Sequence, residues 1–332
     1  MEDNAQQNQM KDSVNVDAFD SKKTSRLSIL GLCFFAAFVA LCGHYIFAHW
    51  EDFSFVSNVS LPETAVAGFL ILISYLVNSY QLHLFLRKFG IRLRLMELTA
   101  LNMAMLLGNL VIPMRGGTGG LAVYLKRVHG LDFQAFAVIY AGTALLVALI
   151  NAALSLVALF ILGWFYDFIH PGLTICIVAI FACCLYLGVF LPPLKWQDSR
   201  IFGPVFRAAD SWHVLTRDRR LLISATVSLL LISVVLMTAF YFIYGALGTP
   251  LSLSGVMITS SLGNIANLIP ITPGSLGIFD AVVIQIPQLF GVDPARAIAA
   301  TLVFRVLCFF WALLLGIPGM YYLFKNGPTG KP

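Results

Sequence analysis

Charged residues are scarce in this chain of 332 residues, where Asp, Glu, Lys and Arg make up 11% of the sequence. A typical soluble domain has about 25%. Hydrophobic residues make up 59%, and apolar stretches long enough to cross a bilayer recur along the chain. This composition excludes an ordinary soluble globular protein and predicts an all-α integral membrane protein. The net charge of +5 does not indicate nucleic-acid binding, because Lys and Arg lie between the apolar stretches, as in cytoplasmic loops that face anionic lipid.

Cysteine is also scarce and shows no functional spacing. The six cysteines all lie inside apolar stretches, at Cys33, Cys42, Cys176, Cys183, Cys184 and Cys308. Their spacing fits neither a disulfide framework nor a metal site, so we interpret them as small buried hydrophobic residues. The sequence also has no P-loop, no HExxH motif and no nucleophile–base motif. These absences favour a non-enzymatic protein without a metal or cofactor.

The basic residues predict how the apolar spans are oriented. Lys and Arg precede the first span and recur in the segment 87–97, whereas the segment 50–62 carries only acidic charge. Because cytoplasmic loops are enriched in Lys and Arg, we expect a multi-pass protein of the cell (inner) membrane with both termini in the cytoplasm. The predicted apolar spans cover residues 27–49, 63–86, 97–113, 132–162, 171–191, 221–246, 252–270, 274–290 and 295–324.

The stretch PMRGGTGG, residues 113–120, follows one of these spans with four glycines and an arginine. If span 97–113 crossed the membrane, the basic cluster at 126–129 would lie outside, against the positive-inside rule. We therefore predict a re-entrant helical hairpin over residues 97–128 that opens to the cytoplasm. Irregular backbone at membrane depth is tolerated where it is buried in protein or lines a cavity. A second hairpin, over residues 252–290, is predicted to break at a Pro/Gly-rich stretch and to open to the outside.

An internal repeat relates the two hairpins. The segments LGN and GLD at Gly108 and Gly130 match LGN and GVD at Gly263 and Gly291. The offsets are 155 and 161 residues (263 − 108 and 291 − 130), so six inserted residues account for the difference. Because the hairpins open to opposite sides, we expect about six full spans plus two re-entrant hairpins in an inverted repeat, as in secondary transporters. The alternative is eight or nine simple crossings with kinks.

The expected organisation is two membrane repeats between short tails. Residues 1–26 form a polar, disordered cytoplasmic tail, residues 27–162 the first repeat, residues 163–325 the second, and residues 326–332 a second cytoplasmic tail. Within the second repeat, residues 193–220 form a basic cytoplasmic loop. Its apolar residues fit either an amphipathic helix on the membrane surface or an ordinary solvated loop.

Three ionisable residues stand out at membrane depth: Arg115, Asp280 and Arg305. Such residues are costly in lipid and usually face a cavity or a partner. One interpretation is a structural ion pair between Asp280 and Arg305. The other assigns Arg115 and Arg305 to a lipid phosphate, because the guanidinium group matches its geometry. The sequence does not distinguish the two.

The glycine-rich breaks suggest a second kind of anion site. Helices predicted over 121–128 and 276–288 begin just after the breaks, and a helix N-terminus offers unpaired N–H groups to an anion. Thr118, Thr272 and Ser275 either cap these helices or donate to the ligand. Asn side chains before the breaks either bond between helices or line a polar groove. The predicted substrate-binding residues are Asn109, Arg115, Gly116, Gly117, Thr118, Asn264, Thr272, Gly274, Ser275, Asp280 and Arg305.

The stretch PITPGSLGIFDAVV, followed by GVDPARAIAATLVFR, resembles the transmembrane flippase domain of lysylphosphatidylglycerol synthetases and their stand-alone relatives. PMRGGTGGLAVYLKRVHGLD resembles a glycine-rich motif of the same family, and the resemblance covers residues 27–325. It implies a flippase-like membrane fold. Two positions depart from the family pattern: Asp280 stands where Glu is common, and VIYAGTALL lacks a Glu-Arg pair that relatives often carry. The chain ends soon after its last span, so we expect it to lack the aminoacyl-transferase domain and not to make lysyl-lipid.

These observations lead to three hypotheses of function. The first is a flippase that moves an anionic or modified phospholipid, or a polyprenyl-phosphate lipid, between leaflets. The second is a membrane enzyme that acts on a lipid headgroup, with Asp280 as general base or metal ligand. The third is a non-transporting partner subunit of a lipid-modifying enzyme, with loop 193–220 as its docking surface. The sequence indicates membrane phospholipids as partners but not the headgroup, the direction, the energy source or the oligomeric state.

Overall fold

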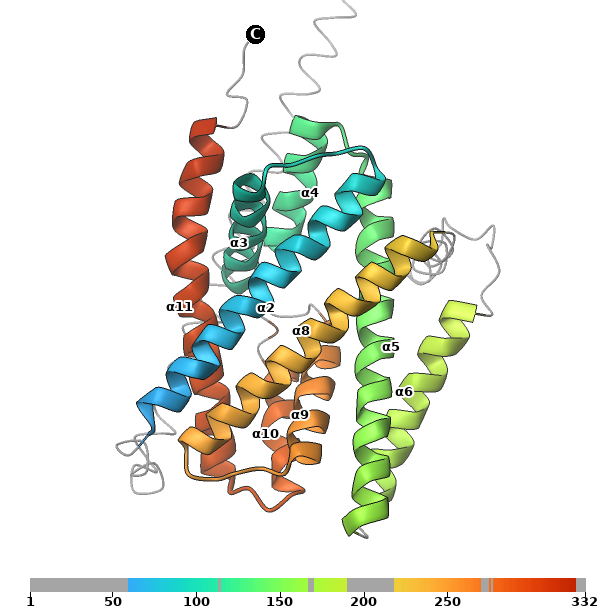
Figure 1. The fold of residues 1–332 in the computed structure, drawn as a ribbon, viewed down its shortest axis with the longest axis vertical. Helices are drawn as coiled ribbons and strands as arrows, with labels where there is room; N and C mark the ends of the chain where they lie inside the picture. Colours follow the sequence, from blue (N-terminus) through green and yellow to red (C-terminus); the bar gives the residue numbers. More distant parts are fainter. Residues whose placement is uncertain are drawn as a thin grey trace, which may run out of the picture.

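The computed structural model describes residues 59–112, 115–166, 170–189, 218–269, 275 and 277–326, and every regular element in these ranges is an α-helix (Figure 1). This confirms the prediction of an all-α membrane protein. The expected tail 1–26, the expected first span 27–49 and most of loop 193–220 lie outside the described residues. The described helices are α2 (Leu61–Lys88), α3 (Leu95–Val111), α4 (Gly116–His129), α5 (Phe133–Tyr166), α6 (Pro171–Val189), α8 (Arg219–Ala246), α9 (Leu253–Ala266), α10 (Ile278–Gln288) and α11 (Pro294–Asn326).

Four described helices, α2, α5, α8 and α11, are long and apolar enough to cross a membrane. They have 28, 34, 28 and 33 residues. At about 1.5 Å per residue, each is longer than the ~30 Å hydrocarbon core. These segments are helical because lipid offers no partner for backbone N–H and C=O groups, which the helix satisfies internally. α6 is shorter, with 19 residues, and corresponds to the expected span 171–191. The number of full crossings stays a prediction.

The other four helices, α3, α4, α9 and α10, are shorter, with 17, 14, 14 and 11 residues. Figure 1 shows α3 and α4 as an antiparallel pair in the half of the molecule where α2 and α11 end. It shows α9 and α10 as a second pair in the half where α11 begins. The inner ends of the two pairs approach each other near mid-height (Figure 1), where Arg115, just before α4, contacts Asn267, just after α9.

The first break is shorter than the sequence predicts. α4 begins at Gly116 rather than at residue 121, and Arg115 precedes it in the left-handed conformation with φ of 54°. The glycine run is therefore helical. A Cβ added at Gly117 would lie 2.0 Å from the backbone oxygen of Met105 in α3, a distance that no real Cβ tolerates. The glycines thus allow α4 to pack closely on α3 instead of forming a flexible turn.

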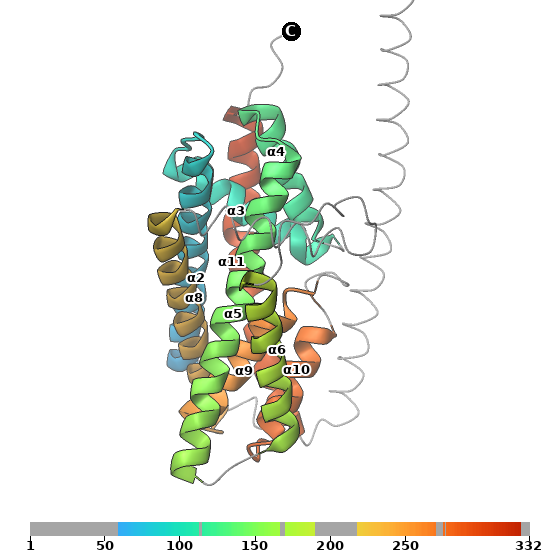
Figure 2. The same ribbon diagram turned by 90° about the vertical axis from the view of Figure 1, so that its right-hand side faces the viewer.

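The long helices pack against one another, and each hairpin packs against a long helix from the other half of the sequence. α2 packs along α8 on one face of the bundle, as both views show (Figures 1 and 2). α3 packs along α11, and α9 packs along α5. Each hairpin therefore lies against the last long helix of the other half of the sequence. The indole Nε1 of Trp311 in α11 also donates to the backbone oxygen of Gly68 in α2, at 2.7 Å.

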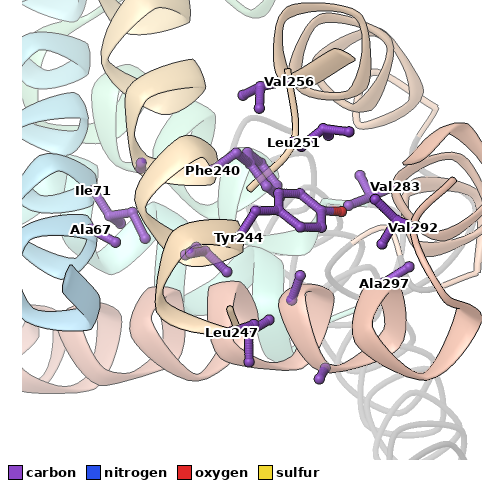
Figure 3. Close-up of a cluster of buried hydrophobic side chains, with 14 of the residues drawn as sticks. Ala67, Ile71, Phe240, Tyr244, Leu247, Leu251, Val256, Val283, Val292 and Ala297 are labelled. Atoms are coloured by element: carbon purple, nitrogen blue, oxygen red, sulfur yellow. The ribbon is translucent and has the colours of Figure 1, made fainter. Parts of the chain in front are cut away.

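A buried apolar cluster joins α2, α8, α9, α10 and α11 on the side of the α9–α10 hairpin. Figure 3 shows Tyr244 extending from α8 toward Val283 of α10, with Phe240 beside it. Ile71 of α2 is fully buried in the same cluster. Because lipid tails are as apolar as these side chains, close packing between helices is the term that holds such a cluster together within a bilayer.

The turns that follow the two hairpins each contain a glycine in the left-handed conformation. Gly130 and Gly291 both have positive φ, of 71° and 81°. The residue after each glycine then donates its N–H back across the helix end, Leu131 to the oxygen of Leu125 and Val292 to the oxygen of Pro287. Leu131 and Val292 are both buried. The two blocks that match in sequence therefore share a positive-φ glycine followed by a buried residue, although the back-bonds span six residues in the first turn and five in the second.

Candidate functional site

A cavity of about 340 Å³ lies where the inner ends of the hairpins meet, with walls from α2, α3, α4, α5, α8, α9, α10 and α11. Many of the residues around it are apolar, as expected of a small-molecule or lipid site. Its polar and charged residues are Ser74, Asn78, Gln81, Asn102, Asn109, Arg115, Thr143, Asn151, Ser233, Asn264, Asn267, Ser275 and Arg305, together with the hydroxyl-bearing rings of Tyr75 and Tyr140.

Arg115 joins the first hairpin to the second. Its Nη1 donates to the hydroxyl oxygen of Tyr140 in α5 at 2.9 Å, and its Nη2 donates to the backbone oxygen of Asn267 at the end of α9. The guanidinium carbon lies 5.6 Å from the centre of the Tyr140 ring, within the range of a cation–π contact. Both hydrogen-bond partners are uncharged, so neither neutralises the charge of Arg115.

Asn109 and Thr118 hold the tip of the first hairpin together. The side-chain oxygen of Asn109, near the end of α3, accepts the backbone N–H of Thr118 in the first turn of α4 at 2.9 Å. The side-chain nitrogen of Asn109 donates to the Thr118 hydroxyl at 3.1 Å, and that hydroxyl also lies 3.2 Å from the Tyr140 hydroxyl. Thr118 does not cap α4 with its own side chain. The cap comes from the preceding helix, which leaves fewer free N–H groups for an anion than the sequence suggests.

Asp280 and Arg305 form the ion pair that one of the two sequence interpretations predicts. Arg305 Nε in α11 donates to Asp280 Oδ1 in α10 at 2.6 Å. The second carboxylate oxygen accepts the backbone N–H of Gly277 at 2.9 Å. Both side chains are buried, and the Arg305 guanidinium carbon lies 5.4 Å from the centre of the Phe279 ring. Asp280 therefore pairs with Arg305 and not with Arg115.

Asn264 and Ser275 occupy the end of the second hairpin. Asn264 Nδ2 donates to the side-chain oxygen of Asn151 in α5 at 3.1 Å, so it bonds between helices and also lines the cavity. Ser275 has a positive φ of 55°, and its hydroxyl donates to the backbone oxygen of Asn267 at 3.4 Å. That oxygen thus receives hydrogen bonds from both hairpins, because Arg115 also donates to it.

The sequence-predicted residues fall into three groups. Asn109, Arg115, Asn264, Ser275 and Arg305 line the cavity. Near it, Thr118 and Asp280 bond cavity-lining residues, while Gly116 and Gly117 form the first turn of α4 and serve close packing on α3. Thr272 and Gly274 lie outside the described residues.

Sequence analysis missed the polar face of α5. Tyr140, Thr143 and Asn151 all line the cavity, and their spacing of three and then eight residues keeps them near one face of a helix. Polar residues at helical spacing inside an otherwise apolar span were the signal that would have identified this face. Tyr140 lies within the stretch VIYAGTALL, which lacks the Glu-Arg pair that relatives often carry. Its hydroxyl supplies a polar contact in that stretch by accepting a hydrogen bond from Arg115.

Two features of the described residues bear on the enzymatic hypothesis. Within the described ranges, no group of three or more His, Cys, Asp or Glu side chains is placed to hold a metal ion. Asp280, the residue expected to act as a general base in the enzymatic hypothesis, has one oxygen bonded to Arg305 and the other to a backbone N–H. Both carboxylate oxygens are therefore engaged within the protein, which leaves Asp280 poorly placed to contact a substrate.

The chain is similar to known membrane proteins over most of its length. A family model described as the lysylphosphatidylglycerol synthase TM region matches residues 28–316. A UPF0104 membrane protein of Methanothermobacter thermautotrophicus (strain ATCC 29096 / DSM 1053 / JCM 10044 / NBRC 100330 / Delta H) is 25% identical over 125 residues, which are 38% of this chain and 37% of that protein. The chain therefore spans less than half the length of this curated relative.

Proposed function

Since this chain belongs to the family of the lysylphosphatidylglycerol synthase TM region, which fits a lipid-related function in a membrane, we propose that it is a lipid flippase. It moves an anionic or modified phospholipid, or a polyprenyl-phosphate lipid, between the two leaflets. The phosphate of the headgroup binds in the cavity between the hairpins, while the acyl or prenyl chains stay in the bilayer. Small movements of the two halves then open the cavity to each leaflet in turn.

The observation that carries this proposal is Arg115 in the cavity wall. Arg115 donates hydrogen bonds to a tyrosine hydroxyl and a backbone oxygen, neither of them charged, so its charge is available to an anion. An arginine at membrane depth is costly, and its cost falls when an anionic ligand pairs with it. The guanidinium fork matches a phosphate, and the surrounding walls have a low dielectric that strengthens the attraction.

The arrangement of the hairpins supports alternating access. At about 1.5 Å per residue, the helices of 11 and 14 residues reach only about 16 and 21 Å, less than the ~30 Å core. In the repeat, each helix of the first half corresponds to one of the second: α2 to α8, α3 to α9, α4 to α10 and α5 to α11. The main packing contacts correspond in the same way, so that α3 packs on α11 just as α9 packs on α5. Re-entrant hairpins related in this way are the arrangement that inverted-repeat transporters use to place a binding site near the midplane.

The distribution of basic residues supports a cytoplasmic opening for the α3–α4 hairpin. Arg92 lies between α2 and α3, and Arg127 and Lys325 lie in the last turns of α4 and α11. Figure 1 shows these helix ends at the end of the molecule where this hairpin opens. Lys88 at the same end donates to Asp218 at 2.6 Å, and this hydrogen bond is the main cause that lowers the pKa of the Asp218 carboxyl below its usual value. The positive-inside rule then puts this end in the cytoplasm.

The test is lipid movement in vesicles that contain the purified protein. Fluorescent phosphatidylglycerol is followed by quenching from outside, and the rates for wild type, Arg115→Ala, Arg115→Lys and Arg127→Ala are compared. Because a hydrogen bond to a charged group contributes about 1.5–3 kcal/mol, Arg115→Ala lowers the rate roughly 10- to 100-fold. Arg115→Lys retains part of the rate, since Lys keeps the charge but lacks the fork. Arg127→Ala, an exposed control, leaves the rate unchanged.

Two outcomes would replace the proposal with one of its rivals. A chemically altered lipid, detected by mass spectrometry after incubation with the protein, would indicate an enzyme. A partner subunit would be indicated by two results together. The wild-type protein would show no transport, and deletion of residues 193–217 would remove a co-purifying lipid-modifying enzyme. A wild-type rate that Arg115→Ala leaves unchanged would remove Arg115 from the site.

A further inference from the structure

Two amide side chains in the cavity wall have a polar atom without a hydrogen-bond partner in the described part of the chain. They are Gln81 of α2, through its Nε2, and Asn102 of α3, through its Oδ1. Gln81 is 4% exposed and Asn102 is 0% exposed. A buried polar group without a partner costs about 1–3 kcal/mol, and most native proteins contain few of them. The Gln81 amide N–H group is a donor and the Asn102 side-chain oxygen is an acceptor, and both lie in the wall of the same cavity. This pair points to a ligand that forms a hydrogen bond with each.

The chemistry of the wall narrows the kind of ligand. Seven Asn and Gln side chains line the cavity, Gln81, Asn102 and Asn78 among them. An amide offers both donors and an acceptor, and a hydroxyl likewise both donates and accepts. A wall rich in amides therefore matches a group that carries several hydroxyls, such as glycerol or a sugar.

A cationic headgroup finds no acidic partner among the described lining residues. None of them is Asp or Glu, and their only charged side chains are Arg115 and Arg305. Two of the aromatic rings in the wall, those of Tyr140 and Phe279, already lie against these two arginines. An ammonium group in the cavity would meet a like charge in a low-dielectric site.

We propose that the cavity selects a phosphate-bearing lipid whose headgroup is uncharged and hydroxylated, such as a phosphoglycerol or glycosyl-phosphate lipid, and rejects aminated headgroups. This inference rests on the proposed function, because it assigns the phosphate to Arg115 and the hydroxyls to Gln81 and Asn102. Asn102 and Asn109 are seven residues apart on α3, which is two turns or about 10 Å. Asn109 bonds Thr118 beside the Tyr140 hydroxyl to which Arg115 donates, so the hydroxyl subsite lies about two helical turns from the phosphate subsite.

The first test measures binding to the wild-type protein in detergent. Unlabelled lipids compete with fluorescent phosphatidylglycerol: phosphatidylglycerol itself, a polyprenyl glycosyl phosphate, phosphatidic acid, phosphatidylethanolamine and lysylphosphatidylglycerol. At least one of the two hydroxylated lipids competes about tenfold better than phosphatidic acid and the two aminated lipids, as expected for a gain of one or two net hydrogen bonds. Their relative order identifies glycerol or sugar as the source of the hydroxyls. Equal competition by either aminated lipid overturns the inference.

The second test changes the hydroxyl subsite alone. Gln81→Met removes the unpaired amide with little change in volume, so the fold is retained. The preference for the hydroxylated lipid over phosphatidic acid falls about tenfold, while affinity for phosphatidic acid is unchanged. Gln288→Met is the matched control, because Gln288 lies in α10 away from the cavity lining and already donates to the Ile284 oxygen. An unchanged preference in Gln81→Met overturns the inference.

The two proposals fail in different measurements. If wild-type vesicles show no lipid movement, the flippase proposal fails, while competition in detergent still reports on the headgroup. If lipid moves at an Arg115-dependent rate but all headgroups compete equally, the flippase proposal stands and the headgroup inference fails.

Discussion

Arg115 and Arg305 line the same cavity, yet their charges are balanced differently. Arg305 donates to Asp280 at 2.6 Å, so most of its charge is compensated within the protein. Arg115 bonds a hydroxyl and a backbone oxygen. This difference makes Arg115 the better candidate for an anionic ligand, and it gives Arg305 a structural contribution that any transport assay must separate from binding.

A double-mutant cycle on Asp280 and Arg305 measures that structural contribution. Asp280→Asn or Arg305→Met alone leaves one buried group without its charged partner, which costs about 3–5 kcal/mol of stability. The double variant Asp280→Asn with Arg305→Met loses less than the sum of the two single losses, because neither charge remains. The measurement is chemical denaturation in detergent followed by Trp fluorescence. Strictly additive losses would show that the two residues do not depend on each other.

At the scale of single elements, close contact between α3 and α4 shapes the first hairpin. A Cβ at Gly117 would lie 2.0 Å from the Met105 oxygen, and one at Gly108 would lie 2.6 Å from the Gly117 Cα. On the second hairpin, a Cβ at Gly263 would lie 3.0 Å from Val283 Cγ2, a milder contact with a side chain. Glycine thus permits the tighter approach in the first hairpin, and Asn109 then reaches the N–H of Thr118.

Two glycines on the same helix give a matched test of this packing. Gly117→Ala forces α4 away from α3 and destabilises the protein by about 1–3 kcal/mol, the usual range for overpacking. Gly120→Ala meets nothing within 4 Å and should be neutral or stabilising by up to about 1 kcal/mol, because Ala favours the helix. Thermal unfolding in detergent compares the two. Equal stability of both variants would contradict the close packing.

At the scale of the whole molecule, the two hairpins enter from opposite ends and meet in the middle (Figure 1). Each packs against the last long helix of the other half, α3 on α11 and α9 on α5. Neither half therefore encloses the cavity alone. Its walls come from both, with Arg115 from the first and Arg305 from the second.

Cysteine labelling in a thiol-free background tests whether the hairpins are re-entrant. Arg92→Cys, before α3, and Arg127→Cys, near the end of α4, are both labelled from the cytoplasmic side, since a hairpin returns to the side it entered. Pro250→Cys, before α9, and Pro294→Cys, after α10, are both labelled from the opposite side. All four positions are exposed. Labelling of Arg92→Cys and Arg127→Cys from opposite sides would support simple crossings. A membrane-impermeant maleimide on oriented vesicles makes the measurement.

Much of the architecture could be predicted from the sequence because its signals are local. Hydropathy located the long helices α2, α5, α8 and α11, and glycine and proline located both breaks. Gly130 and Gly291, which match in the internal repeat, both have positive φ. The start of α4 was placed five residues late, because a glycine run predicts a turn unless a neighbouring helix packs on it.

The candidate site was predicted only in part. Asn109, Arg115, Asn264 and Arg305 were identified because polar residues are rare in apolar spans. Tyr140 was missed, since one tyrosine in an apolar helix is an ordinary membrane residue until its neighbours are known. The Asp280–Arg305 pair remained one of two alternatives, because charge alone does not say which arginine the carboxylate meets.

By itself, the sequence determined the membrane class, the family, the helical segments and the two breaks, because each follows from composition or from residues close together in the chain. Only the tertiary structure decided that Arg115 meets Tyr140 and Asn267, which are 25 and 152 residues away, rather than Asp280. It also decided that Gln81 and Asn102 share a cavity with Arg115. The physical reason is that apolar helices in lipid carry little pattern to specify their facing sides, so close packing between distant segments selects them.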